Sequence, residues 1–321
     1  MMKWIILDLV LCVSLASGMV IPFNRLNDEN EFLEFKTQAG VVTGGSAGIG
    51  YATVLEFARK GAEIVFCARD SHPSWYNGTY AQIKINSDPI VIKNQGSATF
   101  FRADISNPKD VRAFISFAYK KMGRIDFAAN VAGIGGYQVR VDLIEDDWLH
   151  GIHDPIRNNL YGTFFLMREE IKHFREHGDK DKVYSIVNFS SVNGKRACEN
   201  CSLYSASKHG IIGLTKSAAL ENVKSSPRIR VNGVAPGMTD TPLTWNQVKL
   251  QEYGMQDWEG EYIDPSHPLW EKWGFVYEST CPAGRMATPL EMAQIALFLS
   301  SQEATYVSGA VYDGDLGYMA Q

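Results

Sequence analysis

The sequence predicts an α/β protein in which one doubly wound parallel sheet forms a single domain. Two observations support this fold class. Segments typical of strands alternate with segments typical of helices from residue 37 to residue 321, as in parallel sheets with crossover helices. The composition does not break along this range, and a chain of 321 residues with 45% apolar and 21% charged residues suits one large globular domain.

The expected elements follow one another in a regular order. Strands are expected at 41–43, 63–68, 98–103, 125–130, 184–189, 228–234 and 309–313. Helices are expected at 51–60, 107–122, 155–174, 202–220 and 289–299. Pro108 in the first turn supports the second helix, and apolar residues at helical spacing without proline support the fourth. Residues 70–97 show no clean helical pattern and are interpreted as a surface excursion.

The pattern of residues 1–20 indicates a signal peptide or an N-terminal membrane anchor. Lys3 precedes an apolar run, and small residues follow it at 16–18. Asp8 interrupts the run, and the apolar stretch continues to nearly membrane-spanning length. We therefore expect the secretory pathway, with membrane association only through this segment. A cytoplasmic protein with an apolar arm is the alternative, and residues 21–36 are interpreted as a polar linker.

Charge and cysteine content narrow the function classes. The net charge of −5 and the absence of a basic run argue against a nucleic-acid-binding surface.

The five cysteines of the chain do not make a disulfide scaffold. Cys198 and Cys201 form a C-x-x-C pair without a second ligand pair, so no metal site is expected. The pair is either a disulfide of an oxidising compartment or two reduced thiols, and we prefer the thiols unless secretion is shown. Asn77-Gly78-Thr79 is a glycosylation sequon only in the secretory pathway.

A glycine-rich turn joins the first strand to the first helix. Thr43 is followed by G-G-S-A-G-I-G at 44–50, then by the helix and a second apolar strand, which makes a βαβ unit. The glycines let the backbone approach a pyrophosphate, whose charge suits the helix N-terminus. The spacing is G-x-x-x-G-x-G rather than G-x-G-x-x-G, and its context predicts a dinucleotide-binding Rossmann fold.

The end of the second strand bears on the choice of cofactor. Folds that bind NAD usually place Asp or Glu there to hold the ribose 2′-hydroxyl. Here that position holds Ala68, and Arg69 follows. An arginine can pair with a 2′-phosphate, and the missing carboxylate removes repulsion. We therefore expect NADP rather than NAD; in the alternative, Arg69 is solvated and Asp70 binds the ribose.

Tyr204 and Lys208 are candidates for acid–base chemistry. They stand at i and i+4 of the expected helix, so their side chains share one face. A free tyrosine titrates near pH ~10, and a nearby cation lowers that pKa. Ser191 follows a strand, at an edge where open α/β sheets bind ligands. The same pair also fits an ordinary amphipathic helix, so the interpretation depends on a cofactor site elsewhere.

Together these motifs resemble the short-chain dehydrogenase/reductase family from about Gly40 onward. The matching segments are T-G-x-x-x-G-x-G at 43–50, Asp104 after the third strand, N-V-A-G at 130–133 in place of N-N-A-G, Asn159 within N-x-x-G-T, Ser191, Y-x-x-x-K at 204–208 and P-G-x-x-x-T at 236–241. Motifs in this order are far more specific than any one of them alone.

The resemblance implies hydride transfer between NADP(H) and a carbonyl or alcohol carbon. Tyr204 would be the general acid/base and Lys208 would lower its pKa and bind the nicotinamide ribose. Ser191 would hold the substrate oxygen, and Asn159 would position a water in a proton relay. The expected cofactor-binding residues are Thr43, Gly44, Ser46, Gly48, Ile49, Gly50, Arg69, Asp104, Ile105, Asn130, Ala132, Gly133, Tyr204, Lys208, Pro236, Gly237 and Thr241.

Several alternatives stay open. Asp104 either contacts the adenine or only caps the next turn. The aromatic segment 242–280 lies where the family places its substrate lid and favours an apolar substrate, or else it packs the domain or an oligomer interface. The protein is an NADP-linked enzyme, an NAD-linked alcohol dehydrogenase or a non-catalytic dinucleotide-binding protein. The family resemblance implies a homodimer or homotetramer.

Overall fold

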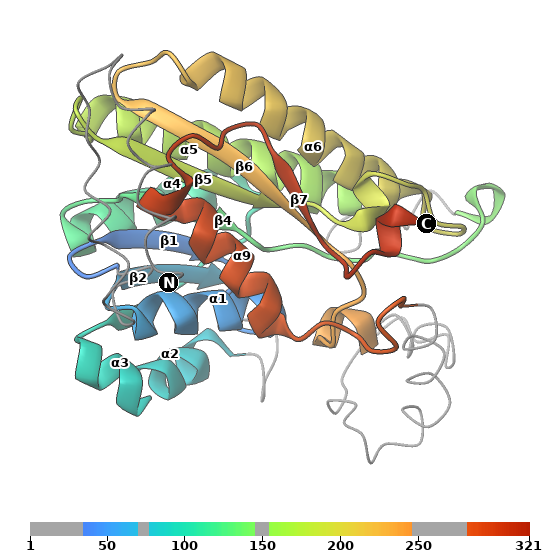
Figure 1. Ribbon diagram of the computed structural model, residues 1–321, viewed down its shortest axis with the longest axis horizontal. Coiled ribbons are helices and arrows are strands. Elements are labelled where there is room, and N and C mark those ends of the chain that lie inside the picture. The colour runs from blue at the N-terminus through green and yellow to red at the C-terminus, as the bar shows by residue number, and fades with distance from the viewer. Residues whose placement is uncertain (1–34, 70–76, 145–153, 246–280) are drawn as a thin grey trace, which may run out of the picture. The chain divides into compact units, whose positions relative to one another are not determined.

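The computed structural model describes residues 35–69, 77–144, 154–245 and 281–321. All of them belong to one compact unit, Leu33–Gln321. Its sheet has seven strands in the order β3-β2-β1-β4-β5-β6-β7 (Figure 1), and each neighbouring pair is parallel. The predicted doubly wound parallel sheet and single domain are therefore confirmed.

The strands lie close to their predicted positions. Their bounds are β1 Ala39–Thr43, β2 Glu63–Ala68, β3 Ser97–Arg102, β4 Phe127–Asn130, β5 Val183–Phe189, β6 Arg228–Pro236 and β7 Val311–Gly314. The strand order reverses between β1 and β4, whose last residues Thr43 and Asn130 are in register. In open α/β sheets the crevice at the carboxyl ends of such strands is where ligands bind.

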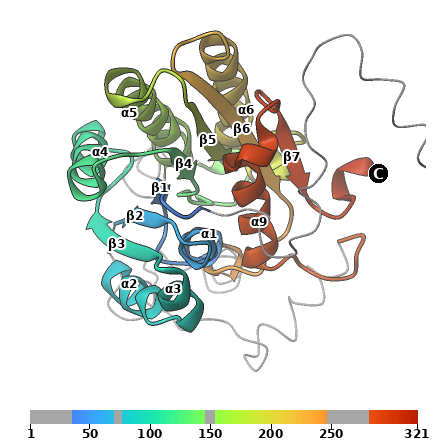
Figure 2. The same cartoon turned by 60° about the vertical axis from the view of Figure 1, so that its left-hand side comes forward.

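Helices cover both faces of the sheet. The α-helices are α1 Gly48–Arg59, α2 Gly78–Asn86, α3 Pro89–Asn94, α4 Pro108–Met122, α5 Gly162–His177, α6 Ser202–Asn222 and α9 Pro289–Ser300. A π-helical turn, η5 Ile156–Tyr161, precedes α5, and the short 3-10 turns are η2 Val141–Leu143, η6 Val192–Gly194, η7 Gln302–Ala304 and η8 Tyr318–Ala320. Helices α4, α5 and α6 lie on one face, with α1 and α9 on the other (Figure 2).

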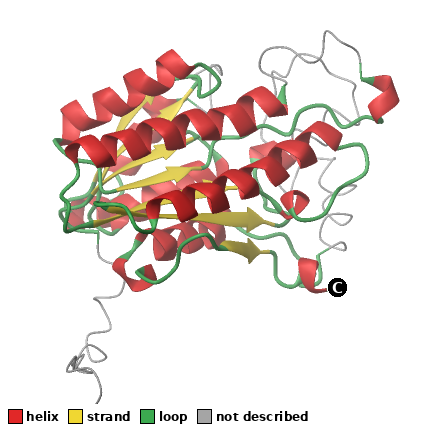
Figure 3. Cartoon of the chain, turned by 90° about the horizontal axis from the view of Figure 1, so that it is seen from above, coloured by secondary structure: helices red, strands yellow, loops and turns green. Residues whose placement is uncertain are grey.

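The core reflects the alternation of side chains along each strand. Val41 and Ala128 belong to the cluster under α4, α5 and α6, whereas the next residues, Val42 and Ala129, belong to the cluster under α1. Successive strand residues point to opposite faces, and a parallel sheet covered by helices buries both. The helices run alongside the strands (Figure 3), so the loops that follow the strand ends gather at one edge.

The expectation of an irregular excursion at 70–97 is wrong, because α2 and α3 occupy most of it. Asn77 caps α2 by accepting a hydrogen bond from the Thr79 N–H at 2.7 Å. Asp88 caps α3 by accepting from the N–H groups of Ile90 and Val91, with Pro89 in the first turn. Both helices are short, which is why their apolar periodicity is weak and their caps define them.

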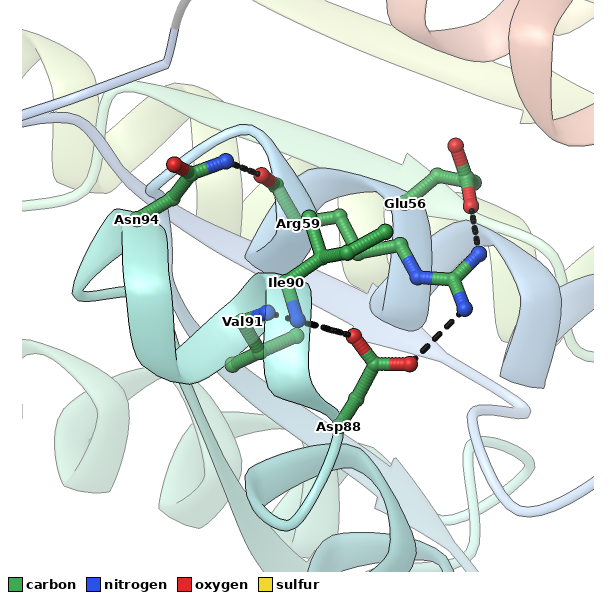
Figure 4. A network of polar contacts seen from close by, with 6 residues as sticks. All are labelled: Glu56, Arg59, Asp88, Ile90, Val91 and Asn94. Atoms are coloured by element: carbon green, nitrogen blue, oxygen red, sulfur yellow. Dashed lines mark hydrogen bonds and ion pairs between the residues drawn. The ribbon is translucent and has the colours of Figure 1, made fainter.

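A partly exposed polar network, here called the outer network, fastens α3 to α1 (Figure 4). Arg59 pairs with Asp88 at 2.7 Å and with Glu56 at 2.8 Å. The Asn94 side chain donates to the Arg59 carbonyl at 2.6 Å. The hydrogen bond with Arg59 is the main cause that lowers the pKa of the Asp88 carboxyl.

The compact unit begins before the predicted boundary at residue 37. Phe35, expected in the linker, is fully buried, and its ring contacts Phe57 and Phe127 at centroid distances of 4.9 and 5.3 Å. The predicted signal or anchor at 1–20 and residues 246–280 of the predicted lid lie outside the described residues. Within the described ranges, no helix has the length and apolarity needed to cross a membrane.

Candidate active site

The glycine turn has the geometry that its sequence predicts. Gly44 and Gly48 have positive φ angles of 71° and 52°, a region that favours glycine. A Cβ on Gly50 would lie 2.1 Å from the Gly44 carbonyl oxygen, so no larger residue fits there. Helix α1 starts with no side-chain cap and no acidic residue in its first turn. The N-terminal N–H groups and the helix dipole therefore favour an anion.

The segments after β4 and β6 lie beside this turn. The Ala132 N–H donates to the Thr43 hydroxyl at 3.1 Å and ties the end of β4 to the end of β1. A Cβ on Gly48 would approach Thr241 to 3.3 Å, so the segment that follows Pro236 and Gly237 returns to the glycine turn. These contacts form a cradle of backbone and small side chains, which fits a dinucleotide.

Four other residues expected to bind the cofactor differ in their contacts. Ile105 is buried and packs 2.8 Å from where a Gly162 Cβ would stand. Asp104 accepts a hydrogen bond from the Ser106 N–H at 2.9 Å, which supports the turn-capping alternative. Ser46 and Ile49 lie in the glycine turn and at the start of α1, as expected.

Arg69 stands at the end of β2 with a second arginine beside it. Arg102, at the end of β3, is paired in register with Ala68, and its Nε donates to the Arg69 carbonyl at 3.1 Å. The Nη1 atom of Arg69 is buried and makes no hydrogen bond with any described residue. A buried guanidinium nitrogen without an acceptor fits an anionic ligand group.

Helix α6 carries Tyr204 and Lys208 toward one place. The Lys208 ammonium lies 5.6 Å from the centroid of the Tyr204 ring and donates to the Phe189 carbonyl at 3.0 Å. Lys208 is only 4% exposed, and burial lowers its pKa to about 8. The helical i, i+4 prediction for this pair is confirmed in its geometry.

The predicted direction of the Tyr204 pKa shift is not what the structure gives. Burial raises the pKa of Tyr204, and a hydrogen bond with Ser191 opposes that rise. Lys208 is not among the causes of this shift, and its ammonium donates to the Phe189 carbonyl. Ser191 follows β5 and also accepts a hydrogen bond from the Asn193 N–H at 3.1 Å.

Asn159 joins three segments of the site. It lies in η5, and π-helical turns occur frequently at functional sites. Its side chain accepts from the Ile134 N–H at 2.8 Å and donates to the Ile134 carbonyl at 2.9 Å. It also donates to the Ser207 hydroxyl of α6 at 3.2 Å. A Cβ on Gly133 would lie 3.3 Å from both Asn159 Oδ1 and Lys208 Nζ, so a larger residue there would crowd both side chains.

A buried polar network beneath the site was missed by the sequence reasoning. Asn130 donates to Glu170 at 3.1 Å and to Asn188 at 3.0 Å. Asn188 in turn donates to Thr215 of α6 at 3.0 Å. Burial raises the pKa of Glu170 to about 8. A signal was present in the sequence, since helical spacing places Glu170 on the apolar face of α5 with Leu166 and Phe174.

The preferred interpretation of Cys198 and Cys201 as reduced thiols is wrong in the structure. Their sulfur atoms are joined in a disulfide. Cys201 is buried and stands immediately before α6, three residues ahead of Tyr204. The disulfide therefore closes the loop between Ser191 and the helix that carries the tyrosine.

Comparison with known proteins identifies the family. Residues 38–252 match the short chain dehydrogenase family model. The short-chain dehydrogenase/reductase ABA4 of Pyricularia oryzae is 33% identical over 279 residues, which cover 85% of this chain and 89% of that protein. The 3beta-hydroxysteroid dehydrogenase of Mediterraneibacter gnavus is 31% identical over 88% of this chain and 95% of that protein. The chain belongs to the short-chain dehydrogenase/reductase family and is an oxidoreductase.

Solved structures agree with this assignment. Levodione reductase superposes with a TM-score of 0.74 at 28% identity, covering 89% of this chain and 99% of that chain. The 3-ketoacyl-(acyl-carrier-protein) reductase of Brucella melitensis, solved with NADH, has a TM-score of 0.71 at 26% identity, with coverage of 89% and 99%. ElxO, solved with NADP, has a TM-score of 0.69 at 26% identity, with coverage of 88% and 99%. Such neighbours support a nicotinamide dinucleotide cofactor.

Proposed function

We propose that this protein is an NADP(H)-dependent oxidoreductase that interconverts a carbonyl and an alcohol, with Tyr204 as the general acid/base. One observation carries the proposal: Asn159 and Lys208 flank Gly133 from two elements, and Ser191 lies close enough to Tyr204 on α6 to oppose the rise of its pKa. The four groups thus meet at the carboxyl edge of the sheet, next to the cradle built by the glycine turn.

The roles follow from the geometry of these side chains. A bound nicotinamide supplies the hydride acceptor or donor. Tyr204 gives its hydroxyl proton to a substrate oxygen in reduction and removes one in oxidation. Ser191 holds that oxygen against the phenol. Lys208, whose pKa is lowered to about 8 by burial, supplies a cation beside Tyr204 and would bind the ribose of the cofactor. Asn159 fixes the 133–134 segment against α6.

The preference for NADP rests on the end of β2. Arg69 has a buried Nη1 without a hydrogen-bond partner among the described residues, Arg102 lies beside it, and Ala68 stands where a ribose-binding carboxylate would be expected. A 2′-phosphate would gain charge-assisted hydrogen bonds here. The solved neighbours carry NADH in one case and NADP in another, so the arginines and not the neighbours favour NADP.

The Arg69→Ala variant tests this preference. We expect the dissociation constant for NADPH to rise about tenfold or more, since hydrogen bonds to charged groups contribute roughly 1.5–3 kcal/mol, while that for NADH stays within about twofold. The control is Arg228→Ala, an exposed arginine at the start of β6 in the opposite half of the sheet. An unchanged NADPH affinity in Arg69→Ala would remove the phosphate argument and favour the NAD-linked alternative.

An apolar substrate is the second part of the proposal. The segment 242–280 is rich in aromatic residues, and its described root is anchored by Trp245, which is 1% exposed and donates to Asp240 at 2.7 Å. Relatives named for a hydroxysteroid and for levodione support cyclic, weakly polar carbonyl compounds. A screen of such ketones with NADPH, and of matching alcohols with NADP and NAD, tests this. Tight cofactor binding without any turnover would favour the non-catalytic alternative.

Oligomeric state and compartment complete the proposal. Tyr161 and Phe164 around the start of α5 and Leu220 on α6 are exposed, which supports a homodimer or homotetramer. Sedimentation velocity measures the oligomeric state directly.

The Cys198–Cys201 disulfide supports the secretory pathway over the cytoplasm. Mass spectrometry of the mature N-terminus and a thiol count on the unfolded protein test it; an identical count with and without reductant would contradict the disulfide.

A further inference from the structure

Glu170 is an unusual residue for its position. It projects from α5 into the core and is only 1% exposed. One carboxyl oxygen accepts the Asn130 amide at 3.1 Å, while Oε1 has no hydrogen-bond partner among the described residues. A buried carboxylate without a countercharge is costly, and such a group takes up a proton instead.

The hydrogen-bond inventory also favours a proton on this carboxyl. Both N–H groups of Asn130 are used, on Glu170 and on Asn188. The orphaned atoms of the pair, Glu170 Oε1 and Asn130 Oδ1, are both acceptors. An ionised carboxylate can only accept, whereas a neutral carboxylic acid adds one O–H donor. Protonation therefore supplies the kind of group that this part of the buried polar network lacks.

Asn130, the partner of Glu170, lies where β4 leads into the turn at 131–134. Asn130 is the last residue of β4, in register with Thr43 and Asn188. The segment that follows it bonds to Thr43 through Ala132 and packs Gly133 against Asn159 and Lys208. The buried polar network thus spans β4, β5, α5 and α6, and these elements carry or adjoin every expected catalytic residue.

We propose that Glu170 is a positioning residue whose buried, protonated carboxyl holds the Asn130 amide, and through it the 131–134 turn, in the shape that binds the nicotinamide cofactor. This inference rests on the proposed function for the identity of the ligand. Ionisation of Glu170 at alkaline pH places a negative charge next to Asn130 and disturbs the turn, so cofactor affinity falls as pH rises.

Among the described residues, none offers Glu170 a compensating cation that shifts its pKa. The causes that shift its pKa to about 8 are burial, which raises it, and the Asn130 hydrogen bond, which lowers it. The titratable neighbour on β2 is the Cys67 thiol, whose pKa burial raises and which also senses Glu170, Asp104 and Asp110. On β5 and α6 the network continues from Asn130 through Asn188 and Thr215, which do not titrate.

Infrared spectroscopy of the protein without cofactor tests the protonation state. We expect the carbonyl stretch of a neutral carboxylic acid at about pH 6, lost with a midpoint near about 8. The band should be missing from Glu170→Gln and kept in Glu169→Gln, a neighbouring glutamate that instead pairs with Arg168 and Lys172. A wild-type spectrum without this band, or one unchanged by Glu170→Gln, overturns the proposal whether or not a cofactor binds.

NADPH titrations followed by fluorescence test the positioning role. In the wild type and in Glu169→Gln, we expect the dissociation constant to rise about tenfold, or about 1.4 kcal/mol, between about pH 7 and pH 9.5. Glu170→Gln keeps the wild-type affinity at pH 7, because its amide is neutral and still accepts from Asn130. Its affinity falls less than that of the wild type up to about pH 9.5, where the loss of charge on Lys208 acts in both proteins. Glu170→Leu binds weakly at every pH. A folded Glu170→Leu with wild-type affinity and pH profile overturns the role, whereas failure of the wild type to bind NADPH or NADH refutes the proposed function instead.

Discussion

Asp88 in the outer network and Glu170 in the buried polar network are both carboxyl side chains that fasten a helix, yet their environments act in opposite directions. Asp88 meets Arg59 at 2.7 Å near the surface, and its pKa is lowered chiefly by that hydrogen bond. The one hydrogen bond that Glu170 makes with described residues is to the amide of Asn130, and burial raises its pKa to about 8. The same chemical group is an ion in one network and an acid in the other.

The comparison shows where this fold buries polar groups at a cost in folding free energy. Near α1 and α3, opposite charges face each other and remain partly solvated, so each substitution there affects local stability only modestly. Beneath the carboxyl ends of β4 and β5, the described polar groups are buried without a countercharge. Such burial costs free energy, so we expect it mainly where function requires it. Substitutions in the two regions should therefore separate activity from stability.

The largest expected effect is on turnover and comes from a substitution in the candidate active site, above the buried polar network. Tyr204→Phe removes the proton-transfer hydroxyl, and general acid–base catalysis contributes roughly 10²–10⁴-fold. We expect kcat to fall by about that factor, while the NADPH dissociation constant and the melting temperature change little. Steady-state kinetics and fluorescence titration measure both, and full turnover in the variant would end the proton-transfer role for Tyr204.

The next effect is the pH dependence of stability, which has opposite signs in the two networks. Glu170 has a raised pKa in the folded state, so its contribution is complete below the unfolded value near 4.5 and is lost as pH rises through about 8. Asp88 has a lowered pKa, so its contribution is present above the unfolded value of 3.8 and is lost as pH falls.

Melting temperatures of the wild type and Glu170→Gln at about pH 5 and about pH 9 measure this difference. The wild type should lose a few degrees more than the variant over that interval, since about 1 kcal/mol shifts Tm by roughly 2–4 °C in large domains. Asp88→Asn should leave this alkaline loss in place and weaken the acid-side dependence instead. Parallel curves for the wild type and Glu170→Gln would show that Glu170 does not titrate in this range.

The smallest effect lies in the outer network. Asp88→Ala removes both the cap of α3 and the ion pair, and we expect it to lower the free energy of unfolding by about 1–2 kcal/mol. Asp88→Asn keeps a capping oxygen and loses only the charge, so it should lower it by no more than about 1 kcal/mol. Urea denaturation separates the two, with kcat unchanged in both. Equal losses would mean that the ion pair, and not the cap, fastens α3.

The sequence was sufficient for the sheet, the glycine turn and the elements that bear the expected catalytic residues, because apolar strand runs and the glycine spacing are local signals. It failed where a long-range partner decides the outcome. Glu170 shows only as a charge on an apolar helical face, and its meaning depends on Asn130, which the fold brings across from β4. Helices α2 and α3 were missed because short helices depend on their caps. The Tyr204 pKa took the opposite direction because burial outweighs the opposing effect of Ser191, and the Lys208 pairing that spacing suggests is not among the causes.

The hydrogen bond between Ala132 and Thr43 joins residues 89 positions apart in the chain. The cradle beside it exists only after both halves of the sheet have docked, so a ligand held there binds the native state and not the unfolded chain. At a concentration of about a hundred times its dissociation constant, such a ligand adds roughly 2.7 kcal/mol to the free energy of unfolding. The lifetime of this protein against proteolysis is thereby tied to the supply of its own cofactor.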